Sequence, residues 1–95
     1  MNNVSRETLK GVNMELNSTV IDMTSRNYKQ RFRAEYQQTL IRRNKLSKLV
    51  YNYQQGKLDF IPDTPIGVLM TQCSIMDAYI SILKHRALIE NIELY

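Results

Sequence analysis

The sequence has few of the residues on which disulfide, metal and catalytic sites depend. Its 95 residues include one cysteine, one histidine and no tryptophan. The lone cysteine, Cys73, cannot form an internal disulfide, and its place within an apolar stripe indicates a small buried hydrophobic residue. His85 falls on the side of its expected helix that faces away from the apolar stripes, which indicates a surface histidine. The cysteine usage suits a reducing cytoplasm.

The motifs of catalysis and metal binding are missing as well. The sequence has one histidine and no spacing of serine, histidine and aspartate that is typical of a catalytic triad. Its three glycines form no phosphate-binding loop. Asp59 with Asp63, or Glu90 with Glu93, offers too few ligands for a metal ion. We therefore expect that the protein is not an enzyme and that it has no metal and no cofactor.

Long apolar segments are also scarce. The apolar runs are interrupted too often for a membrane span, and the first residues, MNNVSRETLK, contain no apolar signal core. We expect neither membrane association nor secretion. A chain of 95 residues forms one domain at most and is only marginally stable alone, so self-association would stabilise it.

Acidic residues are nearly absent from one segment, which makes the net charge of +4 uneven along the chain. Residues 25–55 carry eight Lys or Arg and one acid, a net charge of +7, whereas residues 56–95 carry a net charge of −2. A basic patch of this kind is the usual electrostatic feature of a protein with an anionic partner. A solvated helix face is the alternative, and the charge pattern alone does not separate the two.

The stretch Ile66–Leu94 contains no proline and predicts a long helix with two apolar faces. Thr64 supplies a capping oxygen, and Pro65 suits the first helical position. One face combines three- and four-residue steps and consists of Leu69, Cys73, Met76, Ile80, Leu83 and Ala87. The second face recurs at sevens and consists of Val68, Ile75, Ile82 and Ile89. One face can pack inside the chain, and we assign the second to the interface of a homo-oligomer.

The rest of the chain predicts one more long helix and an arm. Residues 1–24 are polar, and we expect an N-terminal arm that is partly ordered. The first long helix covers about residues 25–55, with Thr24 or Ser25 as its cap. The alternative is a helix that begins as early as Ser18.

The connection between the helices, residues 56–65, begins with Gly56, which suits the left-handed conformation that ends a helix. Its apolar residues Leu58, Phe60 and Ile61 predict that it folds back over the end of the helix pair. A connection of this length is compatible with antiparallel neighbours. The predicted fold is therefore all-α, a long antiparallel helical hairpin with an N-terminal arm, which assembles as a homo-oligomeric helical bundle.

Pairing the two helices about this loop gives a register. Residues whose numbers sum to about 121 or 122 then lie level, as Leu46 does with Met76 and Arg42 with Tyr79. The same register places Glu35 opposite Arg86, and Arg31 opposite Glu90. Two pairs of opposite charge thus follow from the position of the loop, and such pairs specify register more than they add stability.

Two stretches, EYQQTLIRRNKLSKLV and FIPDTPIGVLMTQCSIMDAYISILKHRALIENIEL, resemble small helical-hairpin accessory proteins of tailed bacteriophages, the crAss-like-phage related family. The resemblance covers about residues 28–94, and Thr39 departs from it where the family is more often aliphatic. The positions that carry it are Glu35, Tyr36, Arg42, Lys45, Leu46, Met76, Tyr79, Ile82, Leu83, Arg86, Ala87 and Glu90. The resemblance implies a phage accessory protein in the cytoplasm of an infected bacterial host. It brings no agreed biochemical role.

Arginine forks match phosphate oxygens, and aromatic rings stack on bases. Arg42, Arg43, Lys45 and Lys48 form a dense basic run, and Tyr36, Tyr51, Tyr53 and Tyr79 lie near enough in the hairpin to supply rings. Our candidate ligand-binding residues are Tyr36, Arg42, Arg43, Lys45, Tyr79 and Arg86. The alternative is structural, with Glu35 and Glu90 neutralising the two border arginines, Arg42 and Arg86.

By analogy with small helical phage proteins that sequester immune signals, we hypothesise a protein that counters bacterial defence. It would bind a cyclic nucleotide or an ADP-ribose-type ligand at a subunit junction, because a single hairpin has no concavity of its own. The competing hypothesis is a helical module that binds a host protein or a nucleic acid and inhibits a host factor. Of the two ligand classes, nucleic acid is the weaker candidate.

Overall fold

The computed structural model describes residues 14–95, and this part of the chain contains helices and no strand. The short 3-10 helix η1 covers Leu16–Thr19 and continues into α2, Val20–Met23. The two long helices are α3, Tyr28–Gln54, and α4, Ile66–Glu90. The predicted all-α class is confirmed. Of the predicted N-terminal arm, residues 1–13 lie outside the described residues, and the remainder carries η1 and α2.

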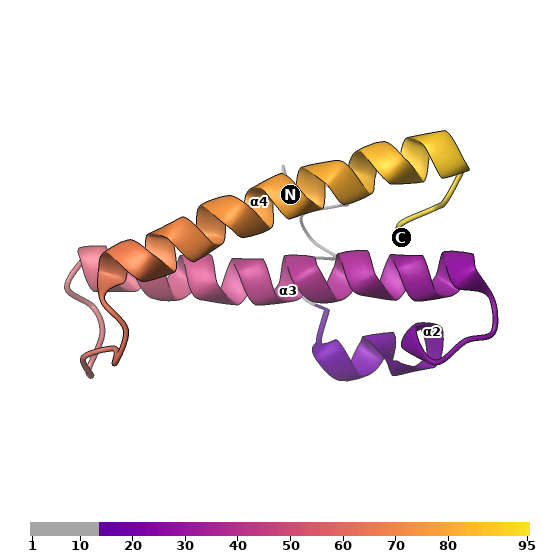
Figure 1. Cartoon of the computed structure of the whole chain (residues 1–95). Coiled ribbons are helices and arrows are strands. Elements are labelled where there is room, and N and C mark those ends of the chain that lie inside the picture. The colour runs from indigo at the N-terminus through magenta and orange to yellow at the C-terminus, as the bar shows by residue number, and fades with distance from the viewer. Residues whose placement is uncertain (1–13) are drawn as a thin grey trace, which may run out of the picture.

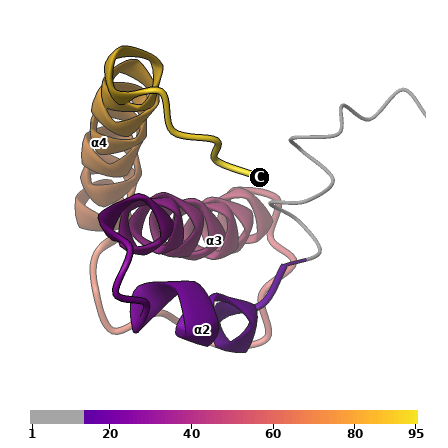
Figure 2. The ribbon, with the colours of Figure 1, turned by 90° about the vertical axis from the view of Figure 1, so that its right-hand side faces the viewer.

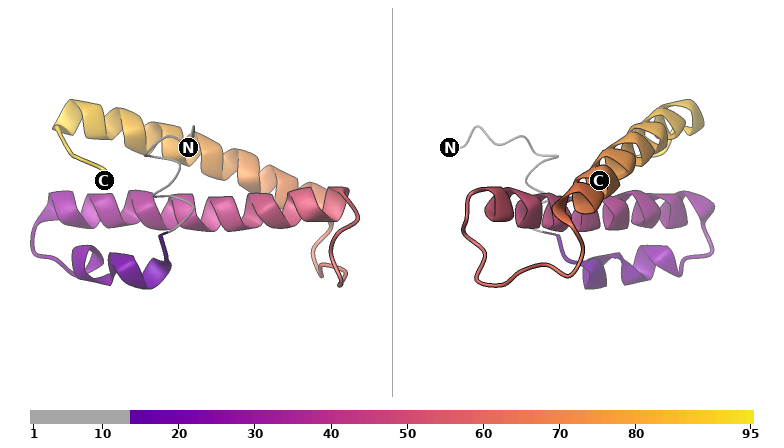
Figure 3. Two further views of the ribbon diagram at one scale, coloured as in Figure 1. Left: turned by 180° about the vertical axis from the view of Figure 1, so that it is seen from behind. Right: turned by 60° about the vertical axis from the view of Figure 1, so that its left-hand side comes forward.

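Helix α3 is the central element, and its neighbours pack on different sides of it. Figure 2 shows α2 on one side of α3, α4 on a second side and the last residues of the chain on a third. Helix α4 begins beside the end of α3 and diverges from α3 toward its own far end (Figures 1 and 3). The wide end of this helix pair is therefore the end away from the loop.

Helix α3 begins later than the sequence predicted. Its cap is Asn27, whose side chain accepts a hydrogen bond of 2.9 Å from the backbone N–H of Lys29. The predicted caps have other roles: the Thr24 hydroxyl donates to the Val20 carbonyl at the end of α2, and the Ser25 hydroxyl accepts from the Asn27 N–H. Three good capping residues stand close together here, so composition alone could not select the cap.

At the other end of α3, Gly56 has φ 69°, which confirms the predicted left-handed turn. The prediction that the following loop folds over the end of the helices is wrong for two of its three apolar residues. Phe60 and Ile61 have 53% and 87% of their surface exposed, and Leu58 is half-buried. The main buried cluster lies at the wide end of the helix pair, and neither Phe60 nor Ile61 belongs to it.

Helix α4 begins without the side-chain cap predicted from Thr64. Pro65 is the capping residue, with an extended backbone, and not the first helical residue. Its carbonyl accepts from the N–H groups of Val68 and Leu69. Proline has no N–H, so this position adds no unpaired donor to the start of the helix.

The core is formed by one face of α4, one face of α3 and the last residues of the chain. Its buried members are Phe32, Tyr36, Ile80, Leu83, Ala87 and Ile92, with Leu40, Leu94 and Tyr95 packed against them. The first predicted face of α4 is thus the inner face, with Leu83 only 1% exposed. The second face, which contains Val68, Ile75, Ile82 and Ile89, is exposed to between 56% and 72%.

The contacts between α3 and α4 differ from the predicted register at the wide end. The predicted ion pair of Glu35 with Arg86 is wrong, because Glu35 accepts a hydrogen bond from the Tyr79 hydroxyl. Arg86 binds Glu90 on its own helix at 2.9 Å. The predicted partner of Glu90, Arg31, donates instead to the carbonyl of Ser25. These side chains therefore have partners other than the predicted ones, although Lys29 and Asn91, whose numbers sum to about 121, still meet at the wide end.

By length and composition α4 is apolar enough to cross a membrane, since its best window has a mean hydropathy of 1.5. The sequence analysis argued against a membrane span because polar residues interrupt the apolar runs. Judged by length and mean hydropathy, these interruptions do not exclude a span. One such helix is weak evidence, because a mostly buried core helix of a soluble protein passes the same test, although only 11% of this window is buried. Asp77 places one charge near the middle of α4, where it forms an ion pair with Arg43 of α3.

The buried and exposed faces of α4 give a matched pair of substitutions. Leu83→Ala should lower the free energy of unfolding by about 2–5 kcal/mol, because it leaves a cavity in the core. Leu88→Ala, on a residue that is 83% exposed, should change it by no more than about 0.5 kcal/mol. Urea denaturation followed by circular dichroism measures both. Equal losses for the two variants would contradict the assignment of the inner face.

Candidate ligand-binding site

A hollow of about 560 Å³ lies along the middle of α3, on the basic part of the chain. We call it the basic pocket. Its lining includes three cations, a tyrosine ring, an amide and a hydroxyl, and the lining residues are Met14, Ile41, Arg43, Asn44, Lys45, Ser47, Lys48 and Tyr51. The volume falls within the range of small-molecule sites in proteins, about 300–1,000 Å³.

The helical repeat explains how these side chains meet. Arg43, Ser47 and Tyr51 follow one another at four-residue steps, and Asn44 and Lys48 do the same on the adjacent row. Two turns of α3 thus supply most of the wall. Met14 comes from the segment that precedes η1, so the pocket also depends on how the N-terminal part packs on α3.

The cations of the basic pocket are unequally neutralised. Arg43 binds Asp77 through two contacts, from Nε to Oδ1 at 2.6 Å and from Nη2 to Oδ2 at 3.3 Å. Lys45 Nζ lies 3.4 Å from Glu15 Oε1, in a pair that is more than 60% exposed. Lys48 is exposed and has no ion pair within residues 14–95. The pocket therefore presents a net positive charge to solvent, which suits an anion.

The structure brings together only two of the six candidate ligand-binding residues. Arg43 and Lys45 line the basic pocket. Tyr79 and Arg86 lie apart from it, on the seam between α4 and α3, where Arg86 stands 4.7 Å above the ring of Phe32. Arg42 is exposed beside Arg43 but does not line the pocket.

The sixth candidate, Tyr36, is completely buried in the core. Its hydroxyl is 2.7 Å from the hydroxyl of Tyr95, and the two rings meet edge to face with centroids 5.7 Å apart. A ring in this position has no free face for a base. Burial of Tyr36 follows from contacts with the end of the chain, which helical spacing does not reveal.

Other lining residues were not among the six candidates. Lys48 belonged to the predicted basic run and lies four residues after Asn44. Tyr51 belonged to the predicted set of rings and lies eight residues after Arg43, so the sequence already indicated that both share a helix face with the pocket. Asn44 and Ser47 gave no separate signal. Met14 could not be assigned, because its place in the wall depends on packing between segments distant in sequence.

A second hollow, of about 580 Å³, lies on the outer face of α4. Its lining is mostly apolar and consists of Pro65, Gly67, Val68, Thr71, Gln72, Ile75 and Met76. Val68 and Ile75 belong to the face assigned to the oligomer interface. The expectation that one chain has no concavity of its own is wrong at the basic pocket, where Met14 packs beside α3, whereas the second hollow is shallow and lined by Pro65 and α4 alone.

In the described part of the chain, no three His, Cys, Asp or Glu side chains lie close enough together to bind a metal ion. His85 is exposed and Cys73 is half-buried. The arrangement in the basic pocket is suited to holding a ligand by charge, hydrogen bonds and ring contact.

Comparison with known proteins gave one informative result. The family model described as Sequestin matches residues 26–89, about two thirds of the chain. The matched region contains all of α3 and nearly all of α4, and it includes every lining residue of the basic pocket except Met14. Neither a curated protein nor a solved structure matches the chain.

The ion pair at the edge of the basic pocket supplies a test. Asp77→Asn should free Arg43 for an external anion, so the protein should bind pyrophosphate more tightly by calorimetry. The loss of stability should stay below about 1 kcal/mol, because the pair is partly exposed. Asp63→Asn, on the exposed loop, is the control and should change neither quantity. Unchanged pyrophosphate affinity in Asp77→Asn would show that Arg43 does not serve the pocket.

Proposed function

The chain belongs to the Sequestin family, and we propose that it is a non-enzymatic protein that sequesters a small anionic nucleotide. The family name is compatible with sequestration of a small molecule. The observation that supports the proposal most directly is the basic pocket, because it combines cations for phosphates with a ring for a base.

In the proposed mechanism Lys48 and Lys45 bind phosphate oxygens, and the Tyr51 ring stacks on a base. Lysine holds phosphate as a compact point charge, and a tyrosine ring accepts any base because every base has a flat apolar face. Asn44 and Ser47 would supply hydrogen bonds to a sugar or a base edge. The pocket lining contains no Asp, Glu, His or Cys, which supports binding without chemical conversion.

The biological role that we propose follows from the resemblance found in the sequence. The protein would be a phage accessory protein that counters bacterial defence in the cytoplasm of the infected host. Its ligand would be a cyclic nucleotide or an ADP-ribose-type molecule used as an immune signal. Sequestration requires tight binding and a high protein concentration, and it requires no turnover.

We also propose that α3 and α4 form an antiparallel hairpin that assembles as a homo-oligomer. Contacts at both ends support the hairpin: Gln54 reaches Met70 beside the loop, and Lys29 reaches Asn91 at the wide end. Assembly is supported by the outer face of α4, where Ile75 and Ile82 are 64% and 56% exposed. Exposed apolar residues in a continuous row are typical of a protein interface.

The proposed ligand site is tested by calorimetric titration with cyclic dinucleotides, cyclic trinucleotides and cyclic ADP-ribose isomers. Lys48→Ala should weaken binding at least about tenfold, because one charge-assisted hydrogen bond is lost. Lys57→Ala, which removes a lysine from the exposed loop, is the matched control and should bind as the unmodified protein does. Absence of heat with every ligand, at concentrations where the assembly is intact, would refute the proposal.

A nucleic-acid ligand is the second candidate, and the net charge of +7 on residues 25–55 favours it. The two classes differ in salt dependence. Affinity for a nucleic-acid strand should fall steeply with salt as counterions are released, and more steeply than affinity for a ligand with two or three phosphates. A mobility-shift series across salt concentrations separates them.

The proposed interface predicts a change in mass. Ile75→Asp should dissociate the assembly, because it buries a charge in an apolar contact, and light scattering should then give the mass of one chain. Ile61→Asp, on the loop residue that is 87% exposed, should leave the mass unchanged. A single-chain mass for the unmodified protein would contradict the proposed assembly.

A further inference from the structure

The five residues after α4 form a separate element, which we call the C-terminal strap, residues 91–95. Helix α4 ends at Glu90, and the capping residue Asn91 has φ 57° and ψ 52°. The N–H of Ile92 donates to the carbonyl of Ala87 at 2.9 Å. This left-handed ending turns the chain back toward α3. Figures 1 and 2 show the strap entering the space where α3 and α4 diverge.

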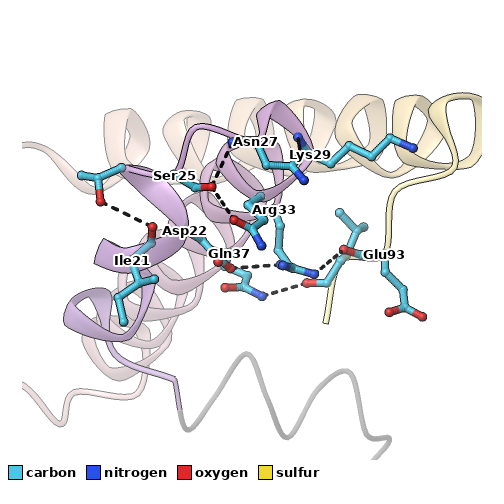
Figure 4. A network of polar contacts seen from close by, with 11 residues as sticks. Ile21, Asp22, Ser25, Asn27, Lys29, Arg33, Gln37 and Glu93 are labelled. Atoms are coloured by element: carbon cyan, nitrogen blue, oxygen red, sulfur yellow. Dashed lines mark hydrogen bonds and ion pairs between the residues drawn. The ribbon is translucent and has the colours of Figure 1, made fainter.

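The strap is held on α3 by three side chains that donate to its backbone. Lys29 Nζ donates to the carbonyl of residue 91 at 3.3 Å, Arg33 Nη1 to that of residue 93 at 3.4 Å, and Gln37 Nε2 to that of residue 94 at 2.8 Å. The three donors follow at four-residue steps, so they form one row along α3. Figure 4 shows this row approaching the strap.

Apolar side chains of the strap complete the core at the same place. Ile92 is 8% exposed and belongs to the buried cluster, and Leu94 and Tyr95 pack against it. Tyr95 closes over Tyr36, as the hydroxyl and ring contacts show. The strap is therefore a third wall of the core at the wide end of the helix pair.

Arg33 connects the strap to the N-terminal part of the protein. Its Nε donates to Asp22 Oδ2 of α2 at 3.0 Å, while Nη1 reaches the carbonyl of Glu93. Figure 4 shows the guanidinium between the two elements. The planar fork of arginine holds its Nε and Nη1 donors at a fixed separation, so both contacts form from one side chain. One side chain of α3 thus holds α2 on one side and the strap on the other.

We propose that the C-terminal strap is a wedge that sets the divergence of α4 from α3. Ile92, Leu94 and Tyr95 lie between the two helices. Without them, α3 and α4 would move closer together and bury Phe32 and Leu83 against each other. The row of donors keeps the wedge in place. The wedge does not depend on the proposed ligand, but it fixes the direction in which the outer face of α4 is presented for the proposed assembly.

Distances within one chain test the wedge directly. Spin labels are placed at Arg31→Cys and Leu88→Cys for the wide end, and at Tyr53→Cys and Ser74→Cys for the loop end, each pair in a Cys73→Ser background. All four positions are exposed. The labelled full chain is diluted with unlabelled protein, so that pulsed electron resonance reads only distances within a chain.

Deletion of residues 91–95 should give a shorter and broader distance distribution at the wide end and leave the loop-end pair unchanged. Glu93→Ala is the control: it removes an exposed side chain but keeps the backbone carbonyl, so both distributions should stay as in the full chain. An unchanged wide-end distribution after deletion would overturn the proposal. If deletion changes the distances of both spin-label pairs, Ile92→Ala is measured instead, and an unchanged wide-end distribution would again overturn the proposal. This substitution makes the wedge smaller and keeps the strap carbonyls that accept hydrogen bonds from α3.

Discussion

The burial of one face of α4 against α3 is the interaction on which the rest of the structure depends. Leu83 and Ala87 of α4 are nearly inaccessible, and they join Phe32 and Tyr36 in the main apolar cluster. Burial of apolar surface is the main favourable term in folding, at about 25 cal/mol per Å². Since α4 is apolar on two faces and the chain covers one, its outer face is left for another molecule, which in our proposal is a second copy.

The same packing explains why the basic surface is available. α3 uses its apolar positions to contact α4, the strap and the N-terminal helices, so its lysines are left at the margins of these contacts. Lys45 and Lys48 therefore surround a hollow that already contains the ring of Tyr51. The lining residues already lie together, but the exposed lysine side chains would lose rotamer freedom on binding a phosphate.

Much of the fold follows from local signals in the sequence, and the site does so only in part. The inner face of α4 and the turn at Gly56 were predicted, because helical spacing and backbone conformation act over a few residues. The strap and the burial of Tyr36 were missed, because they depend on contacts between residues about 60 positions apart. Of the basic pocket, the sequence indicated the cations, while its shape depends on how Met14 and Ile41 pack.

Our central claim is that the basic pocket, and not the seam at Tyr79 and Arg86, receives the anionic ligand. The most direct measurement is a titration of isotope-labelled protein with a cyclic dinucleotide, read by the shifts of its backbone amide signals. If the basic pocket receives the ligand, the largest shifts fall on Asn44, Lys48 and Tyr51. Shifts confined to Tyr79 and Arg86, with the pocket signals unmoved, would contradict it.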